Sequence, residues 1–171
     1  MMEKRNVTVS AIVAAIVLIG DQLSKHWAET WLRTNGEYKI WDGVLHLRYV
    51  ENRGAAFGMM QGGKWFFLAI TGIACAAMLY FLIKERKRLH FMMTFSLALL
   101  LSGAIGNLID RVALGYVRDM IYVALIDFAV FNVADMAVTV GCCLLVLDLL
   151  FFKGKKYMEM MDKKPQTGEN S

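Results

Sequence analysis

The chain has 171 residues, of which 57% are hydrophobic and one is proline, and its mean hydropathy is +0.45. This composition is too apolar for an ordinary soluble domain of this length. The formal net charge of +4 does not indicate a nucleic-acid partner, because Lys and Arg cluster at the ends of apolar runs, as they do in membrane proteins.

Four apolar runs are each long enough to cross a bilayer as a helix. We therefore predict a mainly α-helical membrane protein, with one membrane domain over residues 1–152 and a polar tail over residues 153–171. The predicted spans are residues 7–27, 65–83, 91–109 and 132–152. The basic leader and the first run also resemble a secretory signal peptide. Since no small-x-small cleavage site follows, we expect a retained first helix.

The segment between the first two runs, residues 28–64, mixes polar and aromatic residues and is predicted to be a loop on the outer side. Asp42-Gly43 separates two β-prone stretches within it, which predicts a hairpin. The predicted turn is of type I′, which needs positive φ at both central positions. All the tryptophans lie in or beside this segment: Trp27, Trp31, Trp41 and Trp65. Because Trp prefers the headgroup level, we expect the segment to lie at the bilayer surface.

Basic residues concentrate in the leader, in the turn after the second run and in the tail. With four spans these three regions share one side of the membrane, and the positive-inside rule makes that side the cytoplasm. Both ends of the chain are then cytoplasmic, whereas Asp21, the 28–64 loop and the segment after the third run lie at the outer face.

Charged and amide side chains interrupt the apolar residues between Gly103 and Asp135. Such groups are costly in a membrane and mark functional sites by default. Asp119 follows the third run across a short loop that contains Gly115, and Asp135 opens the fourth run three residues after Asn132. If the two helices are neighbours, Asp119 and Asp135 can meet at one membrane surface. A pair of close carboxylates is suited to activating a water molecule.

Other polar residues of the third run have structural interpretations as well. Gly103 and Gly106 lie on one face and allow a neighbouring helix to approach closely. For Asp110 we favour an ion pair with Arg111 that reaches the interface over a catalytic role. For Asn107 and Arg111, a functional role and a scaffold role remain equally open.

Several other chemistries are not favoured. Ser24 and Lys25 resemble a serine–lysine dyad, but adjacent residues on a helix point in different directions. No HExxH motif or Cys/His cluster indicates a zinc site, and neither a metal nor a cofactor is predicted. Asp148, near the cytoplasmic end of the fourth run, is interpreted as an interfacial anchor.

Two alternatives from other functional classes stay open at this point. The outer aspartates could form the pathway of a small proton or ion conductor. They could also hold Mg²⁺ in a metal-dependent lipid transferase. Asp119, Asp127 and Asp135 are spaced by eight residues, which is not a single helical face, and this counts against a metal site borne by one helix.

Four sequence blocks lie in order along the chain. They are DQLSK at 21–25, NRGAAFG at 52–58, GAIGNLIDR at 103–111 continued by VRD at 117–119, and FNVAD at 131–135. Together they closely resemble the signal peptidase II family, the bacterial lipoprotein signal peptidases. One departure is Met120, where the family commonly has an aromatic residue.

The resemblance implies an intramembrane aspartic protease that removes signal peptides from prolipoproteins by cleaving before a diacylglyceryl-modified cysteine. It implies that Asp119 and Asp135 are the catalytic pair and that the 28–64 loop forms a small β-sheet cradle. The residues that it marks as binding substrate or supporting the site are Asp21, Asn52, Gly54, Asn107, Arg111 and Asn132. The expected partners are lipidated prolipoproteins and membrane lipids, and the expected unit is a monomer in the bacterial cell membrane, with its site near the outer face.

Overall fold

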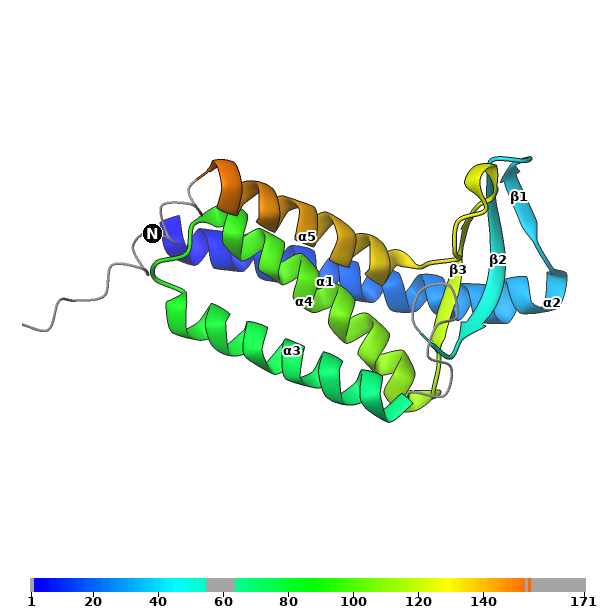
Figure 1. Cartoon of the computed structure of the whole chain (residues 1–171), viewed down its shortest axis with the longest axis horizontal. Coiled ribbons are helices and arrows are strands. Elements are labelled where there is room, and N and C mark those ends of the chain that lie inside the picture. Colours follow the sequence, from blue (N-terminus) through cyan, green and yellow to red (C-terminus); the bar gives the residue numbers. More distant parts are fainter. Residues whose placement is uncertain (1, 55–63, 153, 155–171) are drawn as a thin grey trace, which may run out of the picture.

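The computed structural model describes residues 2–54, 64–152 and 154. Residues 55–58 of the second sequence block, and all of the predicted tail except Gly154, lie outside the described residues. Four helices are long and apolar enough to cross a membrane, which confirms the expected fold class. They are α1 (Met2–Trp27), α3 (Lys64–Glu85), α4 (Phe91–Ala113) and α5 (Val133–Phe151). They run side by side, with a small sheet across one end of the bundle (Figure 1).

Helix α4 lies at the centre of the bundle, in contact with α1, α3 and α5. Two of its glycines allow the closest approaches, as predicted. A Cβ atom at Gly103 would collide with the carbonyl oxygen of Ala134 and the side chain of Val138. A Cβ atom at Gly106 would lie 2.6 Å from the Asp21 carboxylate. The glycines therefore bring α5 and a charged group of α1 directly against α4.

The first helix continues beyond its predicted end. A π-helical turn (Ala28–Leu32) and a short α2 (Arg33–Asn35) follow α1 without a break, so the expectation that the loop starts at residue 28 is wrong. Neither Gly nor Pro occurs between residues 21 and 35, and the Thr30 hydroxyl and Asn35 amide donate to carbonyls of the preceding turn. The helix ends at Gly36, whose φ of +81° is in the left-handed region that favours glycine.

The sheet contains three antiparallel strands in the order β1 (Tyr38–Trp41), β2 (Leu45–Asn52) and β3 (Val117–Val123). The predicted hairpin is confirmed, but its type I′ turn is wrong, since only Gly43 of the central pair has a positive φ. The pairing register of β1 and β2 shifts between Lys39 and Trp41. In addition, the His46 ring accepts a hydrogen bond from the Gly43 N–H at 3.0 Å.

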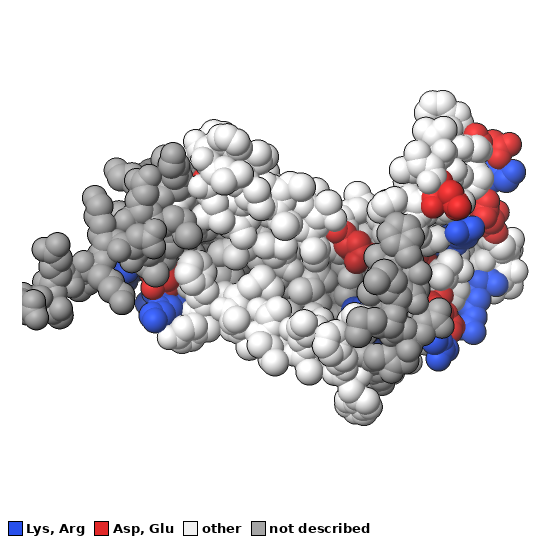
Figure 2. Space-filling model, in the orientation of Figure 1, with Lys and Arg blue, Asp and Glu red and all other residues white. Residues whose placement is uncertain are grey.

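Charged side chains of both signs lie near the two ends of the molecule's long axis. Figure 2 shows acidic and basic side chains near both ends and an uncharged belt between them, as expected for a bilayer-spanning bundle. The turn between α3 and α4, with its basic residues, lies at the end opposite the sheet (Figure 1). Asp148 lies at that end too, but it is fully buried and pairs with His90 at 2.8 Å. It therefore ties the end of α5 to the start of α4, and its interpretation as an interfacial anchor is wrong.

Candidate active site

Asp119 and Asp135 open onto the same cavity at the sheet end of the bundle. Asp119 is the third residue of β3, and Asp135 lies in the first turn of α5. The cavity has a volume of about 520 Å³. Its polar lining consists of Asn52, Gly54, Asn107, Arg111, Asp119 and Asp135. The structure therefore brings together six of the eight site residues marked by the sequence, and the other two, Asp21 and Asn132, are buried directly behind them.

Asn132 places both aspartates. It is the N-cap of α5 and forms a capping box, in which its side-chain oxygen accepts from the Asp135 N–H at 2.9 Å. The Asp135 carboxylate accepts from the Asn132 backbone N–H at 3.2 Å in return. The amide nitrogen of Asn132 then donates to Asp119 at 2.6 Å. One buried amide thus fixes the start of α5 and links it to β3.

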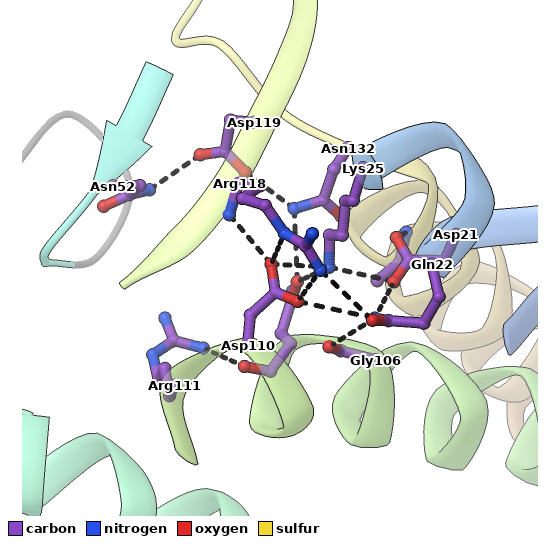
Figure 3. A network of polar contacts seen from close by, with 12 residues as sticks. Asp21, Gln22, Lys25, Asn52, Gly106, Asp110, Arg111, Arg118, Asp119 and Asn132 are labelled. Atoms are coloured by element: carbon purple, nitrogen blue, oxygen red, sulfur yellow. Dashed lines mark hydrogen bonds and ion pairs between the residues drawn. The ribbon is translucent and has the colours of Figure 1, made fainter. Parts of the chain in front are cut away.

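Three asparagine amides are oriented toward the Asp119 and Asp135 carboxylates, because the partner of each amide oxygen can only donate a hydrogen bond. The Asn132 oxygen accepts a backbone N–H, so its nitrogen faces Asp119. The Asn52 oxygen likewise accepts from the Gly54 N–H at 3.0 Å, and its nitrogen donates to Asp119 at 2.9 Å (Figure 3). The Asn107 oxygen accepts from the Lys25 ammonium at 2.9 Å, and its nitrogen donates to Asp135 at 2.7 Å. Each carboxylate therefore has fixed donors on both oxygens.

Lys25 is a member of the site that sequence reasoning missed. Its side chain is fully buried and pairs with Asp21 at 2.9 Å and Asp110 at 3.6 Å, in addition to Asn107. Asp21 in turn accepts from the Ala134 N–H at 2.9 Å, at the N-terminus of α5. The available signal was the pair of charges one helical turn apart, Asp21 and Lys25, inside a membrane span.

Asp110 has a different partner from the one predicted. It is fully buried and binds Arg118 through the guanidinium, at 2.8 Å, and through the backbone N–H, at 2.9 Å. The predicted interfacial pair with Arg111 is therefore wrong. Arg118 also donates to Gln22 at 3.2 Å (Figure 3). It donates to Glu29 at 2.9 Å as well. This network holds the start of β3 against α1 and α4, which places the neighbouring Asp119.

Arg111 brings a positive charge to the cavity. Its guanidinium donates to the carbonyl oxygens of Gly54, at 3.4 Å, and Asn107, at 3.5 Å, and lies 5.2 Å from the centre of the Phe67 ring. Among the residues that the structure describes, it forms no salt bridge with a carboxylate. The side chain thus remains available to orient a polar group in the cavity.

Burial controls the charge state of Asp119. Only 1% of this residue is exposed, and the resulting loss of hydration raises the pKa of Asp119 to about 7. Hydrogen bonds from Asn52 and Asn132 oppose that rise, and the negative charge of Asp135 adds to it. The arrangement can therefore keep one proton on the pair near neutral pH, as general acid–base chemistry requires.

The remaining wall of the cavity is apolar. Apart from Thr139, its residues are apolar, and they come from β3, from the segment before α5 and from α5 itself: Val117, Phe128, Ala129, Val130, Phe131, Met136, Val138 and Val140. Figure 2 shows acidic atoms in the hollow between the bundle and the sheet. A pair of buried carboxylates thus adjoins an apolar surface, which suits a ligand with a hydrocarbon part.

Comparisons with known proteins agree along most of the chain. The model of the family "Signal peptidase (SPase) II" matches residues 13–151. A lipoprotein signal peptidase of Streptococcus thermophilus is 47% identical over 138 residues, which cover 80% of this chain and 90% of the relative. One of Clostridioides difficile is 43% identical over 145 residues, which cover 84% and 97%.

Two solved structures are similar to this chain in both fold and sequence. One bacterial membrane enzyme, solved by the in meso method at 2.3 Å, superposes with a TM-score of 0.77 and is 33% identical, with 95% of each chain covered. A second, solved at 1.9 Å, has a TM-score of 0.75 and is 34% identical, with 84% of this chain and 94% of the other covered. With its four apolar helices and small sheet, this chain is a multi-pass bacterial membrane protein, and it belongs to the signal peptidase II family.

Proposed function

We propose that this protein is a membrane-embedded aspartic endopeptidase that removes signal peptides from prolipoproteins, with Asp119 and Asp135 as its catalytic pair. The observation that carries the assignment is that both buried carboxylates open on one cavity, and each has both oxygens held by oriented donors. Family membership supports the substrate class. We place the cut before the diacylglyceryl-modified cysteine.

The two carboxylates have complementary roles in this reaction. The ionised one takes a proton from a water molecule, whose oxygen then bonds to the scissile carbonyl carbon. The protonated one donates a hydrogen bond to the carbonyl oxygen and favours the tetrahedral intermediate. Collapse of that intermediate breaks the C–N bond, and a proton returns to the leaving amine. The two roles belong to the pair, since coupled groups titrate together.

The supporting residues hold this geometry without reacting. Asn52, Asn107 and Asn132 fix the carboxylate planes, and Asp21 holds the N-terminus of α5 through Ala134. Arg111, beside the Gly54 carbonyl, is proposed to orient the peptide of the substrate.

The test is cleavage of a lipidated and an unlipidated form of one prolipoprotein by the purified enzyme, with and without EDTA. We expect cleavage of the lipidated form only, because the apolar wall beside the dyad is suited to acyl chains. EDTA should leave the rate unchanged. Loss of activity with EDTA and its return with Mg²⁺ would favour the metal-dependent transferase. Equal turnover of the unlipidated precursor would contradict the proposed substrate.

The rate should fall as pH rises through about 7. Burial raises the pKa of Asp119 to about 7, so above that pH Asp119 is increasingly ionised and the pair loses its general acid. At low pH both carboxylates are protonated, no base remains, and the rate should fall again. Substrate-saturated initial rates on a fluorogenic lipopeptide measure this profile. A rate that keeps rising from pH 7 to pH 9 would contradict the proton-sharing pair.

We also propose that both ends of the chain are cytoplasmic and that the site lies near the outer face. The basic turn between α3 and α4 at the end opposite the site supports this orientation. Cysteines introduced as Asn35→Cys and Lys87→Cys, both at exposed positions, test it in a variant that lacks Cys75, Cys142 and Cys143. An impermeant thiol reagent should label position 35 in intact cells and leave position 87 unlabelled. The reverse pattern would contradict the orientation.

A further inference from the structure

A second cavity, of about 470 Å³, lies between α1 and α3 and extends toward the end of the bundle that is opposite the sheet. Helix α4 forms its floor, because α1 and α3 both pack against α4. The α1 side is lined by small residues, including Ala11, Ala14 and Ala15, and this leaves the space open. We call this cavity the α1–α3 groove. It shares no lining residue with the cavity that holds the dyad.

The length of the groove matches one leaflet of a bilayer. Its floor runs from Thr94 to Ile105 on α4, and its α1 wall runs from Val7 to Leu18. At 1.5 Å per helical residue, each of these stretches is about 16 Å long. The hydrocarbon core of a bilayer is about 30 Å thick, so the groove spans roughly half of it. A neighbouring transmembrane helix would instead need a seam along the whole bilayer.

Two polar groups of the groove have no partner in the described part of the chain. Arg86, in the turn after α3, lines the groove and forms no salt bridge with any described residue. Arg88 of the same turn, by contrast, pairs with Glu85 at 3.5 Å. Ser10 is only 2% exposed, and its hydroxyl oxygen has no hydrogen-bond partner among the described residues. A buried hydroxyl without a partner is costly, so a ligand that accepts its hydrogen bond would be favoured.

We propose that the α1–α3 groove binds one acyl chain of an anionic phospholipid from the leaflet opposite the active site. The phosphate pairs with Arg86, and an ester oxygen of the lipid accepts a hydrogen bond from the Ser10 hydroxyl. The apolar walls supply the affinity for the chain, and the guanidinium supplies the preference for negative charge. This site is separate from the proposed catalytic site and does not depend on its assignment.

Native mass spectrometry of the detergent-purified protein tests the proposal, with dioleoylphosphatidylglycerol and dioleoylphosphatidylcholine present in equal amounts. The wild-type protein should retain the anionic lipid about fivefold more than the neutral one, the ratio that corresponds to the ~1 kcal/mol contributed by one basic residue near a membrane. Arg86→Gln should abolish this preference. Lys87→Gln removes the same charge from the next residue, which does not line the groove, and should retain the preference.

A second variant tests the groove apart from its charge. Ala11→Leu places three additional carbon atoms in the groove and should lower retention of both lipids. Cleavage activity, which these positions should not alter, verifies that each variant is folded. The proposal is overturned if Arg86→Gln keeps the preference, if Lys87→Gln loses it equally, or if Ala11→Leu binds both lipids as the wild type does. A dimer without bound lipid would identify the groove as a contact between copies.

Discussion

Asp119→Asn and Asp135→Asn should each lower the cleavage rate by at least about 10³-fold, because each removes either the general base or the general acid. Asn is close to Asp in size and keeps one acceptor oxygen, so the fold should persist. For Asp135, the retained oxygen can still accept from the Asn107 amide nitrogen, which donates to the aspartate at 2.7 Å. Single-turnover cleavage of a lipidated precursor measures the loss, and the amount of protein in the membrane fraction controls for insertion.

A variant that carries both substitutions distinguishes a catalytic pair from two groups that act independently. Residues that act as a unit are strongly non-additive, so Asp119→Asn combined with Asp135→Asn should be little worse than either single variant. Asp127→Asn is the matched control. Asp127 is exposed, bonds the Tyr122 hydroxyl at 2.6 Å and has a φ of +46°, which Asn tolerates. It should keep full activity. Additive losses in the double variant would contradict a shared mechanism.

The bilayer explains why the spans could be predicted from sequence. A membrane helix satisfies its own backbone and needs a run of apolar residues of known length, so composition alone identifies it. The ends of the helices are less determined. The chain stays helical through Ala28–Leu32 because the local sequence contains no helix breaker. A hydropathy pattern does not distinguish a membrane-spanning helix from its extension into the interface.

The site was predictable where its residues are close in sequence, as with Asn132 and Asp135, which lie three positions apart at the start of α5. It was not predictable where partners are far apart. Lys25 and Asn107 are separated by 82 positions, and Asp110 pairs with Arg118 rather than with its neighbour Arg111. Strand β3 was missed for a related reason: its polar residues face buried partners that only the folded bundle provides. Resemblance to the family marked the aspartates, but geometry was needed to show how Lys25, through the Asn107 amide, orients Asp135.

Lys25→Met should lower the free energy of unfolding by about 3–5 kcal/mol, because it leaves the buried Asp21 carboxylate without a compensating charge. Asp21 is almost fully buried and pairs with the Lys25 ammonium at 2.9 Å, whereas the buried Asp110 also pairs with Arg118 and keeps that partner. The substitution also removes the donor that orients the Asn107 amide toward Asp135. We expect kcat to fall about 10²-fold, the effect of a small misplacement of a reacting group. Lys39→Met, at an exposed position on β1, is the matched control and should change neither quantity.

A second variant distinguishes positioning from stability. Lys25→Met combined with Asp21→Asn removes a buried positive and a buried negative charge together, and Asn at position 21 can still accept from the Ala134 N–H. Unfolding in denaturant should show that stability is largely regained. Activity should stay low, since the Asn107 oxygen still lacks its donor. The pH profile supplies an independent readout: burial raises the pKa of Asp119 to about 7, and the positive charge of Lys25 opposes that rise. Without Lys25 the pKa should be higher, so the alkaline limb should move to higher pH. If the double variant recovered the wild-type rate and pH profile, Lys25 would be a structural ion-pair partner and not a positioning residue.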